Sequence, residues 1–219
     1  MKTIVAVYTG KGLADPLQEK INYYLPHFRL VSLIDDTIIG ECVRAGKVTD
    51  SVRKRLFDYY KAAEEMGADV ILNTCSSVGD LVAEGQVLVK TPIVRIDQAM
   101  AEIAVSRYKK IAVVATLSTT LDPTARLLKT VAEENGKEIE IISGLAEGAY
   151  DALISGHPKQ HDERIKQTVA ELSDNGADCI LLAQASMMRM EPVLRETVKA
   201  AVFSSPAPCL EALSEKYPQ

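Results

Sequence analysis

The sequence predicts an α/β protein made of two similar lobes, each a parallel β-sheet flanked by helices. Short apolar, β-branched segments alternate with helical ones, and the same order of segments recurs in the second half of the 219 residues. Continuous apolar strands separated by helices are typical of parallel sheets covered on both faces. We expect an internal duplication, with the lobes related by a pseudo-twofold axis and the functional site in the cleft between them.

An internal repeat supports this organisation. Residues 67–77 (GADVILNTCSS) resemble residues 176–186 (GADCILLAQAS), an offset of 109 between 67 and 176. Residues 4–16 match residues 111–123 at an offset of 107, which pairs Thr9 with Thr116. Two matches in the same order indicate a duplication. We place the first lobe in residues 1–97 and 207–219 and the second in residues 98–206.

The first half begins with a predicted strand at residues 3–9. Asp15-Pro16 has the composition of a helix N-cap and first residue, and Gly67 that of a helix C-terminus. The further elements expected in this half are strands at 30–34, 70–73 and 92–96 and helices at 17–24, 52–66 and from Ser76 onward.

The second half repeats the alternation. A helix is expected to begin at Pro123, and another to end before Gly176. The remaining expectations are strands at 110–115, 139–143 and 179–183, a helix at 161–174, a short helix after residue 183, and a final helix at 206–217 that packs back on the first lobe.

Composition narrows the class of protein. A net charge of −5, scattered Lys and Arg, no Trp and only three Phe argue against a nucleic-acid partner. The N-terminal apolar run is too short for a signal peptide or a membrane span. Four widely spaced cysteines without a CxxC pair predict reduced thiols, no zinc cluster and a cytoplasmic location.

Small polar residues follow four of the predicted strands. In open parallel sheets, ligands bind beyond the carboxyl ends of the strands and next to helix N-termini. Hydroxyl and backbone N–H groups there suit a small carboxylic acid. The expected substrate-binding residues are Thr9, Ser76, Ser77, Thr116, Ser118, Thr119, Ala185 and Ser186.

Cys75 is the candidate reacting group. It ends a strand where a helix begins, a position that lowers the pKa of a thiol. A thiolate there can move a proton on a carbon or attack one. The alternative is a buried small apolar residue, although Thr74, Ser76 and Ser77 beside it are polar. Asp35-Asp36 also follow a strand, but they are more typical of a turn than of a substrate contact.

Together these residues resemble the aspartate/glutamate/hydantoin racemase superfamily. The resemblance rests on strand-end Thr9, on 69–77 (DVILNTCSS), on Ala115-Thr116 and on 178–184 (DCILLAQ). It implies a cofactor-independent enzyme in which each lobe gives one cysteine, the two thiols facing each other across the α-carbon of the substrate. It also implies that Cys75 is the first thiol and that the chain forms a homo-oligomer.

The sequence departs from that pattern at the second thiol. The duplication places Gln184 opposite Cys75, and an amide has no proton that titrates near neutral pH. Ala185-Ser186 also differ from the Thr followed by His or Glu of amino-acid racemases. We therefore expect an isomerase or lyase that acts next to a carboxylate with Cys75 as its single thiol. The alternatives are a two-base amino-acid or hydantoin racemase with a non-Cys second base, and a non-catalytic small-acid binding protein.

Overall fold

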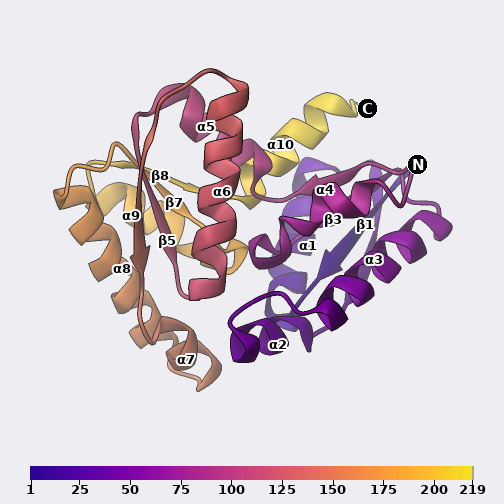
Figure 1. Cartoon of the computed structure of the whole chain (residues 1–219), viewed down its shortest axis with the longest axis horizontal. Coiled ribbons are helices and arrows are strands. Elements are labelled where there is room, and N and C mark those ends of the chain that lie inside the picture. Colours follow the sequence, from indigo (N-terminus) through magenta and orange to yellow (C-terminus); the bar gives the residue numbers. More distant parts are fainter. Residues whose placement is uncertain (219) are drawn as a thin grey trace. The chain divides into compact units, whose positions relative to one another are not determined.

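A computed structural model describes residues 1–218. The chain divides into two compact units, one of Met1–Gln98 with the C-terminal segment from Pro206 and one of Ala99–Ser205. Figure 1 labels the helices and strands of both units.

The first unit contains a four-stranded parallel sheet in the order β2-β1-β3-β4. Its strands are β1 (Lys2–Tyr8), β2 (Phe28–Ile34), β3 (Val70–Asn73) and β4 (Ile93–Arg95). Its helices are α1 (Ala14–Tyr24), α2 (Ile38–Ala45), α3 (Asp50–Glu65), α4 (Leu81–Gln86) and α10 (Pro206–Lys216), with 3-10 turns η1 (Lys11–Leu13) and η2 (Ser76–Val78).

Helix α3 shows how local sequence and packing combine in this unit. The Thr49 side chain caps the helix by accepting a hydrogen bond from the Val52 N–H at 3.1 Å. Gly67, with a φ of +79°, provides the left-handed residue after its C-terminus. Between these ends, Leu56 and Tyr60 are fully buried in an apolar core that they share with residues of β1 and β3.

The second unit repeats the arrangement, with a parallel sheet in the order β6-β5-β7-β8. Its strands are β5 (Lys110–Ala115), β6 (Glu140–Leu145), β7 (Cys179–Leu182) and β8 (Ala201–Ser204). Its helices are α5 (Gln98–Arg107), α6 (Ser118–Glu134), α7 (Ala149–Ile154), α8 (Pro158–Asp174) and α9 (Glu191–Thr197), with the 3-10 segment η3 (Ala185–Met190).

The repeated Gly-Ala-Asp segments have the same structural role in both units. The Asp69 carboxylate accepts a hydrogen bond from the Thr3 N–H at 2.7 Å, at the start of β1. The Asp178 carboxylate accepts one from the Lys110 N–H at 2.8 Å, at the start of β5. The carboxylate thus satisfies a backbone donor of the neighbouring central strand. The prediction of two duplicated parallel α/β halves is confirmed.

Two predicted helix starts are wrong. Helix α6 begins at Ser118, so Pro123 lies inside the helix instead of opening it. Helix α1 begins at Ala14 with Leu13 as its N-cap, which places Asp15 in the first turn. The Asp-Pro pairs predicted a cap and first residue, but the preceding residues already have helical conformation and move each start toward the N-terminus.

Several short elements were not predicted, namely α2, α5, α7 and β8. Each has ten residues or fewer, too few for a clear apolar period. None of the helices in residues 1–218 is long and apolar enough to cross a bilayer.

Candidate functional site

Cys75 follows the end of β3 and is the N-cap residue of η2. Two consecutive hydrogen bonds connect the Cys75 backbone to the core of the first unit. The Asn73 side-chain NH₂ donates to the Cys75 backbone carbonyl at 3.1 Å, and the Tyr60 hydroxyl donates to the Asn73 side-chain oxygen at 3.3 Å. Because Tyr60 is fully buried, these hydrogen bonds fix the Cys75 peptide to the core.

The Cys75 side chain is half-buried and surrounded by hydrogen-bond donors. Burial raises the pKa of the thiol, while the Thr9 hydroxyl, the N–H groups of Ser77 and Val78 and the Ser77 hydroxyl act to lower the pKa. Burial outweighs the donors, so the pKa lies above its ordinary value, and the expectation of a lowered pKa is wrong. The donors at the turn are present, but a three-residue 3-10 turn does not offset the loss of water.

The hydroxyl residues expected in the first unit lie at the carboxyl end of its sheet. Thr9 follows β1 and is buried, and Ser76 and Ser77 are buried after Cys75. The Ser76 hydroxyl has no hydrogen-bond partner among residues 1–218. A buried hydroxyl without a partner is unusual, so Ser76 has a donor and lone pairs left for a ligand.

In the second unit, Thr116 and Gln184 lie at the ends of β5 and β7. The Gln184 side-chain oxygen accepts hydrogen bonds from the Thr116 N–H at 2.5 Å and from the Thr116 hydroxyl at 2.9 Å. Each unit therefore joins the threonine after its first strand to the residue after its third strand. In the first unit that contact is from Thr9 to Cys75.

The other expected residues of the second unit differ in exposure. Ser118 and Ser186 are exposed, whereas Ala185 is buried. Thr119 is half-buried, and its hydroxyl has no hydrogen-bond partner in the described part of the chain. Thr116 and Gln184 are joined to each other by a side-chain hydrogen bond.

Arg95, at the end of β4, was not identified from the sequence. Its guanidinium donates two hydrogen bonds to the Asp97 carboxylate, at 3.0 and 3.1 Å, and is 3.4 Å from the Asp80 carboxylate. It also lies against the Cys75 loop, since a Cβ added to Gly79 would come within 2.5 Å of the guanidinium. Arg95 thus supports that loop. Its signal in the sequence was an Arg-x-Asp that begins on the last residue of a strand.

Asp35 forms a turn. Its carboxylate accepts hydrogen bonds from the Thr37 N–H at 3.0 Å and the Thr37 hydroxyl at 2.6 Å. Its second oxygen accepts from Arg55 at 2.6 Å and from the Tyr59 hydroxyl at 2.9 Å. These contacts confirm a turn at Asp35 and leave the carboxylate committed to protein groups.

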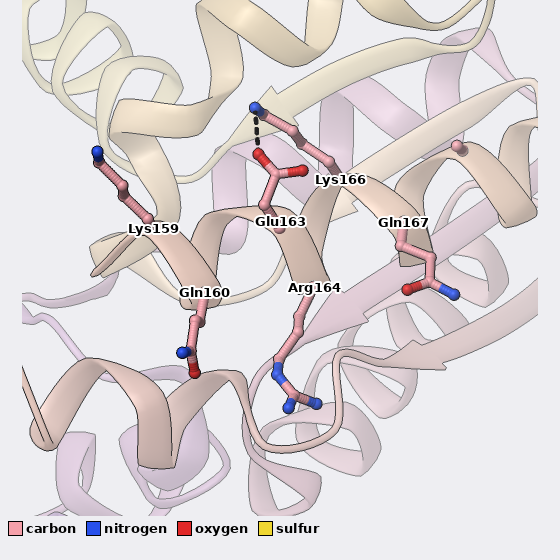
Figure 2. A pocket seen from close by; sticks show the side chains of 7 residues that line it. Lys159, Gln160, Glu163, Arg164, Lys166 and Gln167 are labelled. Atoms are coloured by element: carbon pink, nitrogen blue, oxygen red, sulfur yellow. Dashed lines mark hydrogen bonds and ion pairs between the residues drawn. The ribbon is translucent and has the colours of Figure 1, made fainter. Parts of the chain in front are cut away.

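Figure 2 shows a shallow pocket on the exposed face of α8. Its side chains point outward from one helix, and Lys166 pairs with Glu163 at 2.9 Å. The lining residues are Lys159, Gln160, Glu163, Arg164, Lys166, Gln167 and Ala170. None of them follows a strand, so this pocket is separate from the strand-end residues described above.

Comparison with known proteins identifies the family. The profile of the Asp/Glu/Hydantoin racemase family matches residues 23–212, and the chain belongs to this family. The assignment as an enzyme of the racemase superfamily follows from that membership. No match was found among curated proteins.

Solved structures share the fold at low sequence identity. Glutamate racemase RacE1 from Bacillus anthracis has a TM-score of 0.81 at 15% identity, covering 98% of this chain and 81% of its own. Aspartate racemase from Picrophilus torridus has a TM-score of 0.71 at 16% identity, covering 99% and 94%. An unliganded arylmalonate decarboxylase has a TM-score of 0.60 at 14% identity, covering 98% and 92%. The fold therefore occurs in both racemases and a decarboxylase.

Proposed function

We propose that this protein is a cofactor-independent isomerase or lyase that acts on the carbon next to a carboxylate of a small acid. Cys75 is its single thiol acid or base. The observation that carries the proposal is the Cys75 thiol at a strand end, within a shell of hydroxyl and N–H donors. Gln184 stands at the repeat position where a second thiol is expected, which favours one-thiol chemistry.

The electrostatics of Cys75 suit a proton donor. A thiol whose pKa lies above its ordinary value is protonated at neutral pH, as a general acid must be. In a decarboxylation, the carbon–carboxylate bond breaks and CO₂ leaves. The electron pair of that bond stays on the α-carbon and delocalises onto the remaining carboxylate as an enediolate. The Cys75 S–H then protonates one face of that carbon, and solvent returns the proton to sulfur.

The polar groups around Cys75 would stabilise the negative charge that develops on the substrate oxygens. Hydroxyl and N–H groups held in place before the reaction contribute most when they point to where charge appears. Ser76, with its unpartnered buried hydroxyl, and Ser77 supply such donors in the first unit. Gln184 would bind the substrate by hydrogen bonds.

The same thiol allows an isomerase reaction. The thiolate would add to an unsaturated diacid, rotation about the new single bond would follow, and elimination would return the thiolate. This route needs the ionised sulfur, so its rate rises with pH up to the pKa of Cys75. The decarboxylation route needs the protonated sulfur, so its rate is constant below that pKa and falls as the pH rises above it.

Replacement of Cys75 tests the proposal. Cys75→Ser should abolish turnover of the active compound in a panel of small hydroxy-, amino- and dicarboxylic acids, with circular dichroism unchanged. Cys209→Ser is the matched control, because this buried thiol lies on α10 and donates a weak hydrogen bond to the Arg95 carbonyl at 4.0 Å, which a serine hydroxyl can also donate. Unchanged activity in Cys75→Ser would exclude the assignment.

The products separate the remaining alternatives. Consumption of both enantiomers of one compound at comparable rates would support a two-base racemase. Release of CO₂ with formation of a single stereoisomer would exclude a two-base racemase. A Cys75 thiol that does not react with substrate-like halo-acids, in a protein that turns over no acid, would indicate a non-catalytic binding protein.

A further inference from the structure

Gln184 has one orientation of its side-chain amide. The Thr116 N–H can only donate a hydrogen bond, so the group 2.5 Å from it must be the Gln184 oxygen. The Thr116 hydroxyl donates to the same oxygen at 2.9 Å. The amide NH₂ therefore points away from Thr116. The reverse orientation would place two donors against the Thr116 N–H.

The Gln184 NH₂ group has no hydrogen-bond partner among residues 1–218, and the residue is half-buried rather than sealed in the core. An NH₂ group with both hydrogens free contacts only acceptors, such as the oxygens of a carboxylate or carbonyl. The segments around it, 116–120 and 184–186, contain no acidic residue. This strand end of the second unit thus offers donors and no negative charge.

The carboxylates that follow strands in the first unit are already paired. Asp97 is fully buried against Arg95, and Asp80 contacts the same guanidinium. Asp35, whose side chain is 9% exposed, pairs with Arg55. A substrate ammonium would need an acceptor or a negative charge, and using any of these would break an ion pair with an arginine.

We propose that Gln184 is a specificity-determining residue that selects a substrate bearing an acceptor, a carboxylate or carbonyl oxygen, where an amino acid bears its ammonium group. This inference rests on the proposed function and narrows its substrate class to diacids and keto or hydroxy acids. The amide would contribute one hydrogen bond to a negatively charged oxygen, and Thr116 positions it for that contact.

Binding of matched acids tests the proposal. Methylmalonate is compared with both enantiomers of alanine, and malate and oxaloacetate with both enantiomers of aspartate. Each of these diacids bears a carboxylate, hydroxyl or keto oxygen where its amino-acid counterpart bears the ammonium group. Calorimetry on the wild-type protein should show at least one diacid binding at least about tenfold more tightly than its amino-acid counterpart, the size expected for one hydrogen bond to a charged group. Equal or tighter binding of the amino acids, or no binding of any diacid, would overturn the proposal.

Gln184→Glu tests the donor itself. The carboxylate keeps an oxygen to accept from Thr116 but replaces the NH₂ group with a second oxygen. We expect the affinity for the diacid to fall at least about tenfold, with no comparable fall for the amino acids. Unchanged diacid affinity in Gln184→Glu would contradict the assigned role. Gln160→Glu, the same change on the exposed face of α8 (Figure 2), is the matched control and should bind like the wild type.

The outcome is separable from that of the proposed function. Binding does not need the thiol, so the same series is repeated in the Cys75→Ser protein. If diacid affinity is insensitive to Gln184→Glu while Cys75→Ser still abolishes turnover, the inference fails and the proposed function stands. If Gln184→Glu changes affinity but Cys75→Ser keeps full turnover, the proposed function fails.

Discussion

Thr116 holds the side-chain oxygen of Gln184 with two hydrogen bonds, one from its N–H and one from its hydroxyl. In the first unit, the hydroxyl of Thr9 contacts the Cys75 sulfur at the equivalent strand ends. The duplication has therefore preserved the threonine and its contact while the group that it contacts differs. A thiol in one unit corresponds to a neutral amide in the other.

The equivalence predicts that a second thiol can be introduced. In Gln184→Cys, the new sulfur should accept from the Thr116 hydroxyl as Cys75 accepts from Thr9. Because a positioned acid or base contributes roughly 10²–10⁴ in rate, we expect racemisation of a chiral product to rise at least about 100-fold. Chiral chromatography of the product and deuterium exchange at its α-carbon measure this rise.

Gln184→Ser is the control for the second thiol. It has similar size but no group that titrates near neutral pH, so its product should keep a single configuration. Product of one configuration from Gln184→Cys as well would argue against the equivalence of the two positions.

The hydrogen bond from the Thr9 hydroxyl is predicted to lower the pKa of Cys75, although burial raises it overall. Thr9→Val removes a hydroxyl that donates to the sulfur and favours the thiolate. A hydrogen bond to a charged group contributes about 1.5 kcal/mol or more, or roughly one pKa unit. The pKa of Cys75 should therefore rise further, and alkylation by iodoacetamide at a fixed pH below that pKa should slow about tenfold.

Thr74→Val is a matched control for Thr9→Val. The Thr74 hydroxyl donates to the Val7 carbonyl at 2.9 Å, and this carbonyl keeps the Thr74 N–H at 3.2 Å after the change. Its effect on the alkylation profile should be small. Equal profiles for Thr9→Val and wild type would show that the Thr9 contact does not influence the thiolate.

Gly79→Ala should destabilise the loop that follows Cys75. The added methyl would lie 2.5 to 2.8 Å from the Arg95 guanidinium, which Asp97 holds with two hydrogen bonds. We expect a loss of about 1–3 kcal/mol in the free energy of unfolding, measured by urea denaturation. Gly12→Ala, with no atom within 4 Å of its added methyl, should be close to neutral. Equal stabilities of the two variants would contradict the close packing of Arg95 against Gly79.

The fold was predictable where a pattern occurs twice. Asp69 and Asp178 each follow Gly-Ala and each accept from the first residues of a neighbouring strand, so the repeat in sequence reports a repeated strand pairing. Strand β8 escaped prediction because its four residues are alternately half-buried and buried, whereas the equally short β3 and β7 are fully buried apolar runs. Helix α6 begins before Pro123 because residues 118–122 already adopt helical conformation, which a rule that places proline in the first turn does not anticipate.

The sequence predicted the positions of the candidate residues at strand ends, but not their electrostatics. Small polar residues after apolar strands singled out Thr9, Cys75 and Gln184, and the structure places them just after β1, β3 and β7. The pKa of Cys75 depends on how much water burial removes, and the orientation of Gln184 depends on the N–H of Thr116. Both are properties of packing between segments far apart in the chain.

The buried cysteines predict how stability changes in alkaline solution. Burial raises the pKa of Cys42 to about 11 and the pKa values of Cys179 and Cys209 to about 12. In the unfolded chain these thiols ionise with a pKa of about 8.5, as free cysteines do. Their contribution to stability is thus fully present below that pH and is lost as the pH rises toward the folded-state values, because only the unfolded state then releases protons.

Cys179→Ala isolates one of these thiols. Cys179 is fully buried in β7, so at neutral pH the variant should be less stable than the wild type because it leaves a small cavity. Above about pH 8.5 the wild type loses up to about 1.4 kcal/mol per pH unit through this thiol, and the variant does not. Urea denaturation from about pH 7 to about pH 10 should therefore show the difference between the two proteins narrowing as the pH rises. A difference that stays constant across this range would mean that Cys179 titrates alike in the folded and unfolded states.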